Sequence, residues 1–332
     1  MILVLRALGV GDLATAVPAL RALRAAAPDR EIALVAPRWL APLVELVGGV
    51  DRLVPVSGLG PLPWPGPPPD LAVNLHGRGP RSHRVLAATC PGRLLAFANP
   101  DAGHVDGPRW RDDEHEVDRW VRLLTWYGIP ADRADLALRR PAPGRAPSGA
   151  TVLHPGTKLA VKRWPAERYA ALARRLTGRG HRVVVTGSAE ERELAGWVAY
   201  HGGLGPEAVL AGRTDLGDLA ALVAYARLVV SNDTGIAHLA TAYGTPSVVL
   251  FGPVPPARWG PPPDRPRHRV LWAGDRGHPA PDLGRERSSA GDWPGRDGGR
   301  TDPALAAVGL DEVLAAVDEA ERAVRISGAV TA

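Results

Sequence analysis

Two lysines stand out in a chain that otherwise uses arginine for positive charge. Lysine and arginine together number 40 among 332 residues, yet Lys158 and Lys162 are the only lysines. Both lie in HPGTKLAVKRWP, residues 154–165, after the apolar run TVLH and before a Trp-Pro pair typical of a helix start. A lysine on such a loop can meet phosphate as a compact mobile charge, and Thr157 adds a hydroxyl in the turn. A solvated surface lysine is the alternative.

A carboxylate follows the first apolar run of the chain. Asp12 closes GVGD, residues 9–12, between MILVL and a segment with helical periodicity. A carboxylate in this position can act as a general base, and Gly9 and Gly11 would allow a tight turn and a close approach of ligand to backbone. Alternatively, Asp12 only caps the helix that follows. The third glycine of the dinucleotide-binding fingerprint is missing.

Two further helix starts carry candidate residues. In SNDTGIAHLA, residues 231–240, Asp233, Thr234 and Gly235 come where a strand gives way to a helix, whose free N–H groups favour an anion. His238 lies one helical turn further on, on the face of Thr234. Glu191 in TGSAEERELA has the position of an acidic residue that binds ribose hydroxyls. Helix capping, a satisfied histidine and a favourable helix dipole explain the same residues without any ligand.

The candidate residues must be positioned by helices and strands. Along the sequence, short apolar runs alternate with amphipathic segments. This alternation predicts an α/β protein with two doubly wound, Rossmann-like domains that face a cleft. The first domain is expected at 1–140, a Pro-rich linker at 141–150 and the second domain at 151–305. Residues 253–303 are rich in Pro, Gly and Arg and predict coil, and a final helix is expected at 306–326.

Composition restricts the partners. The formal net charge is +5 and the pI about 9.8, which favours anionic ligands, but the arginines are scattered, so nucleic acid is not expected. Cys90 is the single cysteine and the histidines are dispersed, so no bound metal and no disulfide framework are expected. The N-terminal apolar run is too short for a signal or membrane helix, which predicts a cytoplasmic protein, peripheral to a membrane at most.

Four segments in order resemble glycosyltransferase family 9, the heptosyltransferase-like enzymes of lipopolysaccharide core assembly. They are the opening strand with its Gly-Asp loop, the Lys-x-Trp-Pro segment, the VVVTGSAEERELA step, and SNDTGIAHLATAYGTPSVVLFGPVPPARWGP. The resemblance covers almost the whole chain. It implies the GT-B fold, in which the N-terminal domain binds the acceptor and the C-terminal domain binds a nucleotide-sugar donor.

The resemblance also implies roles for single residues. Asp12 matches the general base, and Gly9 and Gly11 line the acceptor side. The matching donor-site residues are Lys162, which contacts phosphate, with Thr157, Glu191, Asp233, Thr234, Gly235 and His238. Lys158 has no matching role.

The resulting hypothesis is an inverting, metal-independent glycosyltransferase. It would move a heptose or related sugar from an ADP-linked donor to a hydroxyl of a glycan or glycolipid, with no cofactor. A sugar-nucleotide epimerase on the same scaffold and a non-catalytic sugar-nucleotide-binding protein are the alternatives. A base across the cleft from a phosphate-binding lysine is of no use to a protein that only binds.

Overall fold

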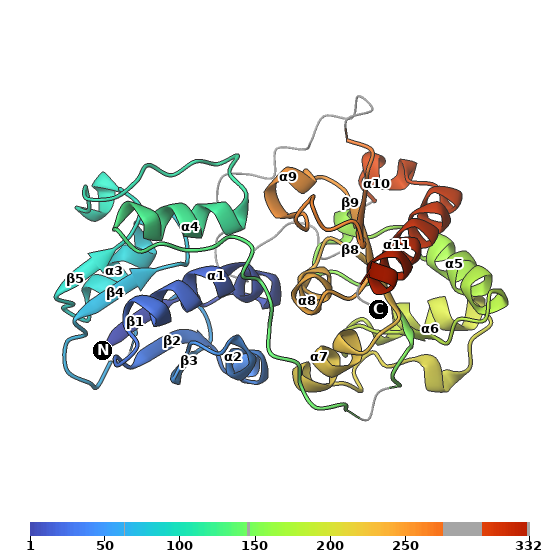
Figure 1. Ribbon diagram of the computed structural model, residues 1–332, viewed down its shortest axis with the longest axis horizontal. Coiled ribbons are helices and arrows are strands. Elements are labelled where there is room, and N and C mark those ends of the chain that lie inside the picture. Colours follow the sequence, from blue (N-terminus) through green and yellow to red (C-terminus); the bar gives the residue numbers. More distant parts are fainter. Residues whose placement is uncertain (63, 145–146, 275–300, 331–332) are drawn as a thin grey trace. The chain divides into compact units, whose positions relative to one another are not determined.

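The computed structural model describes residues 1–332 except 63, 145–146, 275–300 and 331–332. The chain divides into two compact units, 1–139 and 140–332, each built on one five-stranded sheet in which every strand pair is parallel (Figure 1). The predicted α/β class with two doubly wound parallel sheets is confirmed.

The first unit has the strand order β3-β2-β1-β4-β5, so the winding direction reverses between β1 and β4. Ligands of such sheets bind at the carboxyl ends of the strands at this reversal. Short turns of 3₁₀ helix, at 38–40 and 100–102, interrupt its connections. The elements of this unit are β1 (Ile2–Leu5), α1 (Val10–Ala26), β2 (Ile32–Pro37), α2 (Ala41–Val47), β3 (Arg52–Val56), β4 (Leu71–Asn74), α3 (Arg81–Ala87), β5 (Arg93–Leu95) and α4 (Glu116–Trp126).

Both faces of this sheet are covered, which explains why β1 is apolar at every position. Leu3 and Leu5 face a cluster that includes Leu86 of α3, and all four residues of β1 are buried. Burial on both faces is usual for parallel strands and removes the polar alternation of half-exposed strands.

The second unit has the order β10-β9-β8-β6-β7, with its reversal between β6 and β8. This is the flavodoxin-like order rather than that of the first unit, although both follow the same binding rule. Its elements are β6 (Thr151–His154), α5 (Ala166–Gly178), β7 (Val183–Val185), α6 (Arg192–His201), α7 (Leu216–Ala224), β8 (Leu228–Asn232), α8 (Gly235–Tyr243), β9 (Ser247–Phe251), α9 (Pro256–Trp259), β10 (His268–Trp272), α10 (Pro303–Ala307) and α11 (Leu310–Val330).

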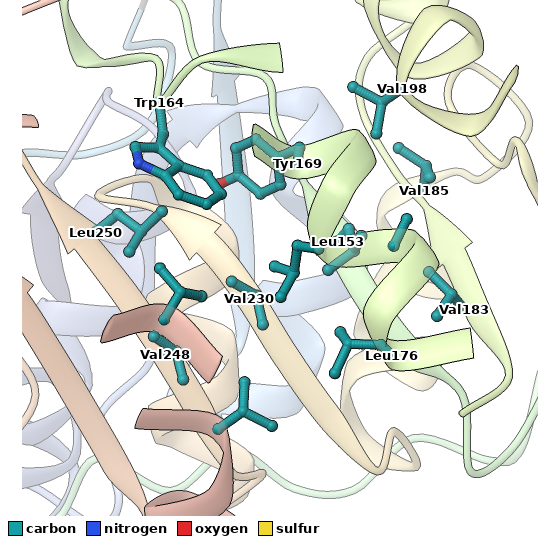
Figure 2. Close-up of a cluster of buried hydrophobic side chains, with 14 of the residues drawn as sticks. Leu153, Trp164, Tyr169, Leu176, Val183, Val185, Val198, Val230, Val248 and Leu250 are labelled. Carbon is teal, nitrogen blue, oxygen red and sulfur yellow. The ribbon is translucent and has the colours of Figure 1, made fainter. Parts of the chain in front are cut away.

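The core of the second unit shows how β9 serves both faces of its sheet. Val248 and Leu250 point into the cluster drawn in Figure 2, which also holds Trp164 and Tyr169 and is closed by α5, α6 and α11. Val249 and Phe251 point to the other face, where α8 packs. Alternate side chains of a strand face opposite sides, so the strand must be apolar throughout.

One expectation for the C-terminal third of the chain is wrong. Residues 253–303 were expected to be coil, but α9 lies within them and β10 forms the fifth strand of the sheet, in register with β9 from His268↔Ser247 to Trp272↔Phe251. Positions 275–300 of that segment lie outside the described residues. The expected final helix, LDEVLAAVDEAERAV (310–324) in the segment 306–326, is present as α11, which begins at Leu310; the short helix α10 before it ends at Ala307.

Candidate functional site

The predicted phosphate-binding loop leaves β6, next to β8, where the winding of the second sheet reverses. Thr157 and Lys162 lie on the loop between β6 and α5, and Asp233 directly follows β8. The register pairs His154 with Ser231, so the ends of both strands reach the same edge of the sheet. This edge is the expected ligand-binding position of a doubly wound sheet.

Lys162 and Asp233 form an ion pair. The lysine Nζ lies 2.7 Å from Asp233 Oδ2, and the two side chains are only 11% and 8% exposed. Lys158 on the same loop is exposed. The sequence assigned both Lys162 and Asp233 to a phosphate site, and the structure brings them into contact. A compact cation at this position can stay with the carboxylate or turn to an anionic ligand.

Asn232 holds the loop in place, and sequence analysis did not single it out. Its Oδ1 accepts a hydrogen bond from the Trp164 backbone N–H at 3.0 Å, and its Nδ2 donates to the Pro155 carbonyl at 2.8 Å. Arg163 adds two bonds to the Thr157 carbonyl, at 3.1 and 2.8 Å. One fully buried amide therefore fixes both ends of the loop, and Thr157 itself is buried.

The C-terminal segment 302–308 also holds this loop. Trp164 Nε1 donates to the Val308 carbonyl at 2.9 Å, and the Asp302 N–H donates to the Val161 carbonyl at 3.0 Å. Arg168 at the start of α5 donates to the carbonyls of Ala306 and Val308. The loop that carries Lys162 is thus held by hydrogen bonds to Asn232 of β8 and to segment 302–308.

The start of α8 lies next to the ion pair in the chain. Thr234 is the N-cap residue, with extended backbone (φ −156°, ψ 176°), but its side chain makes no capping hydrogen bond. The expected side-chain cap is therefore not found at Thr234. Gly235 opens the nine-residue helix, and His238, one turn on, packs its ring edge-on against Trp259 of α9 at 5.7 Å between centroids. The positive end of this helix dipole lies beside Asp233 and can receive an anion.

Glu191 is held against the turn that carries Thr157. Its Oε2 accepts a hydrogen bond from the Ser188 N–H at 2.8 Å, and a Cβ placed on Gly156 would lie 2.2 Å from its carboxyl carbon. A side chain at position 156 would therefore displace the Glu191 carboxyl group. Nearby, burial lowers the pKa of His154, whose Nδ1 lies 2.9 Å from Thr186 Oγ1, while the charge of Glu191 opposes this shift.

Asp12 lies in the first turn of α1, after β1, where the winding of the first sheet reverses. Its Oδ2 accepts a hydrogen bond from the Gly9 N–H at 3.1 Å, so Gly9 is the N-cap residue and Asp12 the third residue of the helix. Asp12 is therefore not the N-cap residue itself, but its carboxylate does cap the start of the helix by accepting the N–H of the N-cap residue. Gly9 has φ −96°, and a Cβ there would make an ordinary 3.5 Å contact, so no special glycine turn is needed. Gly11 lies within α1.

Two residues near Asp12 were missed from the sequence. Arg6 directly follows β1 and is fully buried, with its Nη2 3.5 Å from Asp12 Oδ1. His76 follows β4, and its Nδ1 is buried with no hydrogen-bond partner among the described residues. Burial lowers the pKa of His76 to about 4, with the charges of Arg6 and Arg81 acting in the same direction and Asp12 against them. His76 is neutral at physiological pH, so its imidazole can accept a hydrogen bond.

Metal-binding clusters and membrane-spanning helices are both absent from the described residues. No group of three or more His, Cys, Asp or Glu side chains is placed to hold a metal ion in this part of the chain. Within the same residues, none of the helices has the length and apolarity to cross a bilayer.

This chain is similar to known proteins. Residues 110–289, more than half of the chain, match the model of glycosyltransferase family 9 (heptosyltransferase). Lipopolysaccharide heptosyltransferase 1 of Pseudomonas aeruginosa is 39% identical over 154 residues, which span 44% of this chain and 42% of that protein. Lipopolysaccharide heptosyltransferase 2 of Escherichia coli K12 is 27% identical over 77% of this chain and 83% of its own length.

A solved structure extends the match to the fold. The ADP-heptose lipopolysaccharide heptosyltransferase II of E. coli superposes with a TM-score of 0.72 at 21% identity, covering 97% of this chain and 98% of that one. The two doubly wound sheets are thus those of a GT-B glycosyltransferase. With the family model matching more than half of its length, the chain belongs to glycosyltransferase family 9, the heptosyltransferases, and is a glycosyltransferase.

Proposed function

We propose that this glycosyltransferase moves a heptose from ADP-heptose to a hydroxyl of a lipopolysaccharide-type glycolipid, with inversion at the sugar and without a metal. The observation that carries the proposal is the buried Lys162–Asp233 pair at the β6/β8 reversal, beside the start of α8. A diphosphate placed there gains a mobile cation and a helix N-terminus. The donors and acceptors named for the relatives supply the sugar, the nucleotide and the glycolipid.

The chemistry follows from these groups. The acceptor oxygen attacks the anomeric carbon of the sugar, the bond from that carbon to the diphosphate oxygen breaks, and ADP leaves with the electron pair. Asp12 takes the proton of the attacking hydroxyl, a role that side chains in such sites fill for about 10²- to 10⁴-fold in rate. Lys162 and the N–H groups of α8 stabilise the charge that grows on the leaving ADP. Glu191, close to the Thr157 turn, would bind the ribose hydroxyls.

The proposal is tested by following ADP release from ADP-heptose with and without a heptose-deficient lipopolysaccharide acceptor. We expect release only with acceptor, a product of inverted anomeric configuration, and no effect of EDTA. Asp12→Asn should lower kcat about 10²- to 10⁴-fold and leave the Kd for ADP-heptose within about twofold. Magnesium-restored activity would exclude the metal-free account, and sugar isomerisation without acceptor would favour an epimerase.

A panel of nucleotide sugars identifies the donor independently of the acceptor. A ligand at 100 times its Kd stabilises the folded state by about 2.7 kcal/mol. We expect ADP-heptose to raise the melting temperature more than UDP- or GDP-sugars at equal concentration. A larger shift with another base would reassign the nucleotide, and binding without any transfer to a range of acceptors would favour a non-catalytic binding protein.

A further inference from the structure

Arg6 is the largest charged side chain that the first unit buries completely. It directly follows β1, its side chain has no exposed surface, and its guanidinium lies over the Trp120 ring at 4.6 Å. Burying a guanidinium is costly unless its donors are all used, so its partners show what it is for. The proposed reaction uses Asp12, its neighbour, but gives Arg6 no role.

Arg6 holds Asp12 by backbone and side chain together. Its Nε donates to the Asp12 carbonyl at 2.9 Å, and its Nη2 lies 3.5 Å from Asp12 Oδ1. The other carboxylate oxygen accepts the Gly9 N–H at 3.1 Å. Each oxygen therefore has one fixed positive or donor group beside it, and the Asp12 side chain remains 19% exposed, open to a reactant.

The other side of the guanidinium is anchored to three elements. Arg6 Nη2 donates to Glu116 Oε1 of α4 at 3.0 Å and to Thr15 Oγ1 of α1 at 3.3 Å, and Nη1 donates to the Leu75 carbonyl after β4. Glu116 is in turn paired with Arg119. The planar fork of arginine joins these partners at fixed angles, which a lysine ammonium cannot reproduce.

We propose that Arg6 is the positioning residue for Asp12. Its bonds to the Leu75 carbonyl after β4 and to Glu116 of α4 fix the guanidinium, which in turn fixes the orientation of the Asp12 carboxylate that takes the acceptor proton. This inference rests on the proposed role of Asp12 as the base. A displacement of about 1 Å in a reacting group can cost about 100-fold in rate, so the contact predicts an effect on kcat rather than on donor binding.

A double-mutant cycle tests the inference on the full-length protein with ADP-heptose and acceptor. Arg6→Lys should lower kcat about 10- to 100-fold and leave the Kd for ADP-heptose within about twofold. In an Asp12→Asn background, the same change should lower the residual rate by less than about threefold, because the group it positions is already lost. Arg6→Gln provides a second cycle, with a larger loss of kcat than Arg6→Lys.

Arg119→Lys is the matched control. Arg119 pairs with the same Glu116 and is nearly buried, and it donates hydrogen bonds to Glu116 and to the carbonyls of Arg111 and Glu114. It should lower the melting temperature about as much as Arg6→Lys while kcat stays within about threefold. Equal losses of kcat for Arg6→Lys in both Asp12 backgrounds, or equal losses for the two lysine variants, would overturn the inference. Full activity of Asp12→Asn would instead remove the base role itself.

Discussion

Lys162 and Asp233 lie 71 positions apart, yet Nζ and Oδ2 are 2.7 Å apart at the carboxyl ends of two neighbouring strands. Both side chains are nearly buried, so this pair is screened less than a surface pair. An anionic ligand that takes over the lysine must leave Asp233 with another partner, and a sugar hydroxyl is a suitable donor. In the proposed complex, the pair would therefore contact both the diphosphate and the sugar of the donor.

Lys162→Ala should weaken ADP-heptose binding about 10- to 100-fold, because a charged hydrogen bond of about 1.5–3 kcal/mol is lost. Titration calorimetry with ADP-heptose measures this. Lys158→Ala is the matched control on the same loop, and as an exposed lysine it should change the binding free energy by less than about 0.5 kcal/mol. Similar losses for the two variants would show that the loop acts only through its net charge.

Gly156→Ala should also impair donor binding, through Glu191. The added Cβ would lie 2.2–2.5 Å from the Glu191 carboxyl group, which must move. We expect the Kd for ADP-heptose to rise about 10-fold, which corresponds to a loss of about 1.4 kcal/mol in binding free energy. Gly178→Ala at the end of α5 meets open space and should bind as the parent protein does. An unchanged Kd for Gly156→Ala would show that Glu191 does not contribute to donor binding.

Trp164→Phe should destabilise the second unit by about 1–3 kcal/mol. The change removes the hydrogen bond to Val308 and leaves space in a core that excludes water at this position. Urea denaturation gives the free energy of unfolding. Trp126→Phe is the control, since Trp126 is 59% exposed, and it should have an effect below about 0.5 kcal/mol. Equal stability of both variants would contradict the anchoring role of Trp164.

His268 should make the stability depend on pH. Burial lowers its pKa from 6.5 to about 4, and the charges of Arg265 and Arg267 act in the same direction. Between these values the unfolded chain binds a proton that the folded state excludes. The free energy of unfolding therefore has its full value above pH 6.5. It falls by about 3 kcal/mol as the pH falls to about 4, because the unfolded chain gains the proton that the folded state excludes.

Urea titrations from pH 4 to 7 on His268→Gln test this. The unfolding free energy of the variant should fall less steeply between pH 6.5 and 4 than that of the parent, by about 1.4 kcal/mol per pH unit at most. His201→Gln, on an exposed histidine of α6, serves as the control and should keep the parent slope. Parallel curves for parent and His268→Gln would contradict the prediction.

Helices and strands could be predicted from the sequence where the local pattern of apolar residues agrees with their burial in the fold. Strands such as β1 and β9 are apolar at every position, and α4 has one apolar face, so their types could be predicted without knowing their neighbours. The edge strand β10 was missed because most of its residues are only partly buried and an arginine lies within it. An edge strand lacks the continuous apolar signal of a central one.

The site was predictable to the extent that single residues were unusual. Lys162 could be found because the chain has almost no lysine, but its pairing with Asp233 depends on the β6–β8 register. Arg6 could not be found, because a charged residue after a strand usually turns to solvent. Only the fold reveals its partner Glu116, 110 positions away. Buried polar networks depend on distant residues, and local pattern carries no signal for them.

The contacts of segment 302–308 have a consequence for synthesis on the ribosome. Trp164, Arg168 and the Val161 carbonyl bond to residues that follow them by about 140 positions. A chain emerging from its N-terminus, at about 5–20 residues per second, therefore completes the first unit long before the Lys162 loop can acquire its last supports. The proposed base Asp12 is thus in place early and the loop that carries Lys162 late, so we expect nucleotide binding only after almost the whole chain has been made.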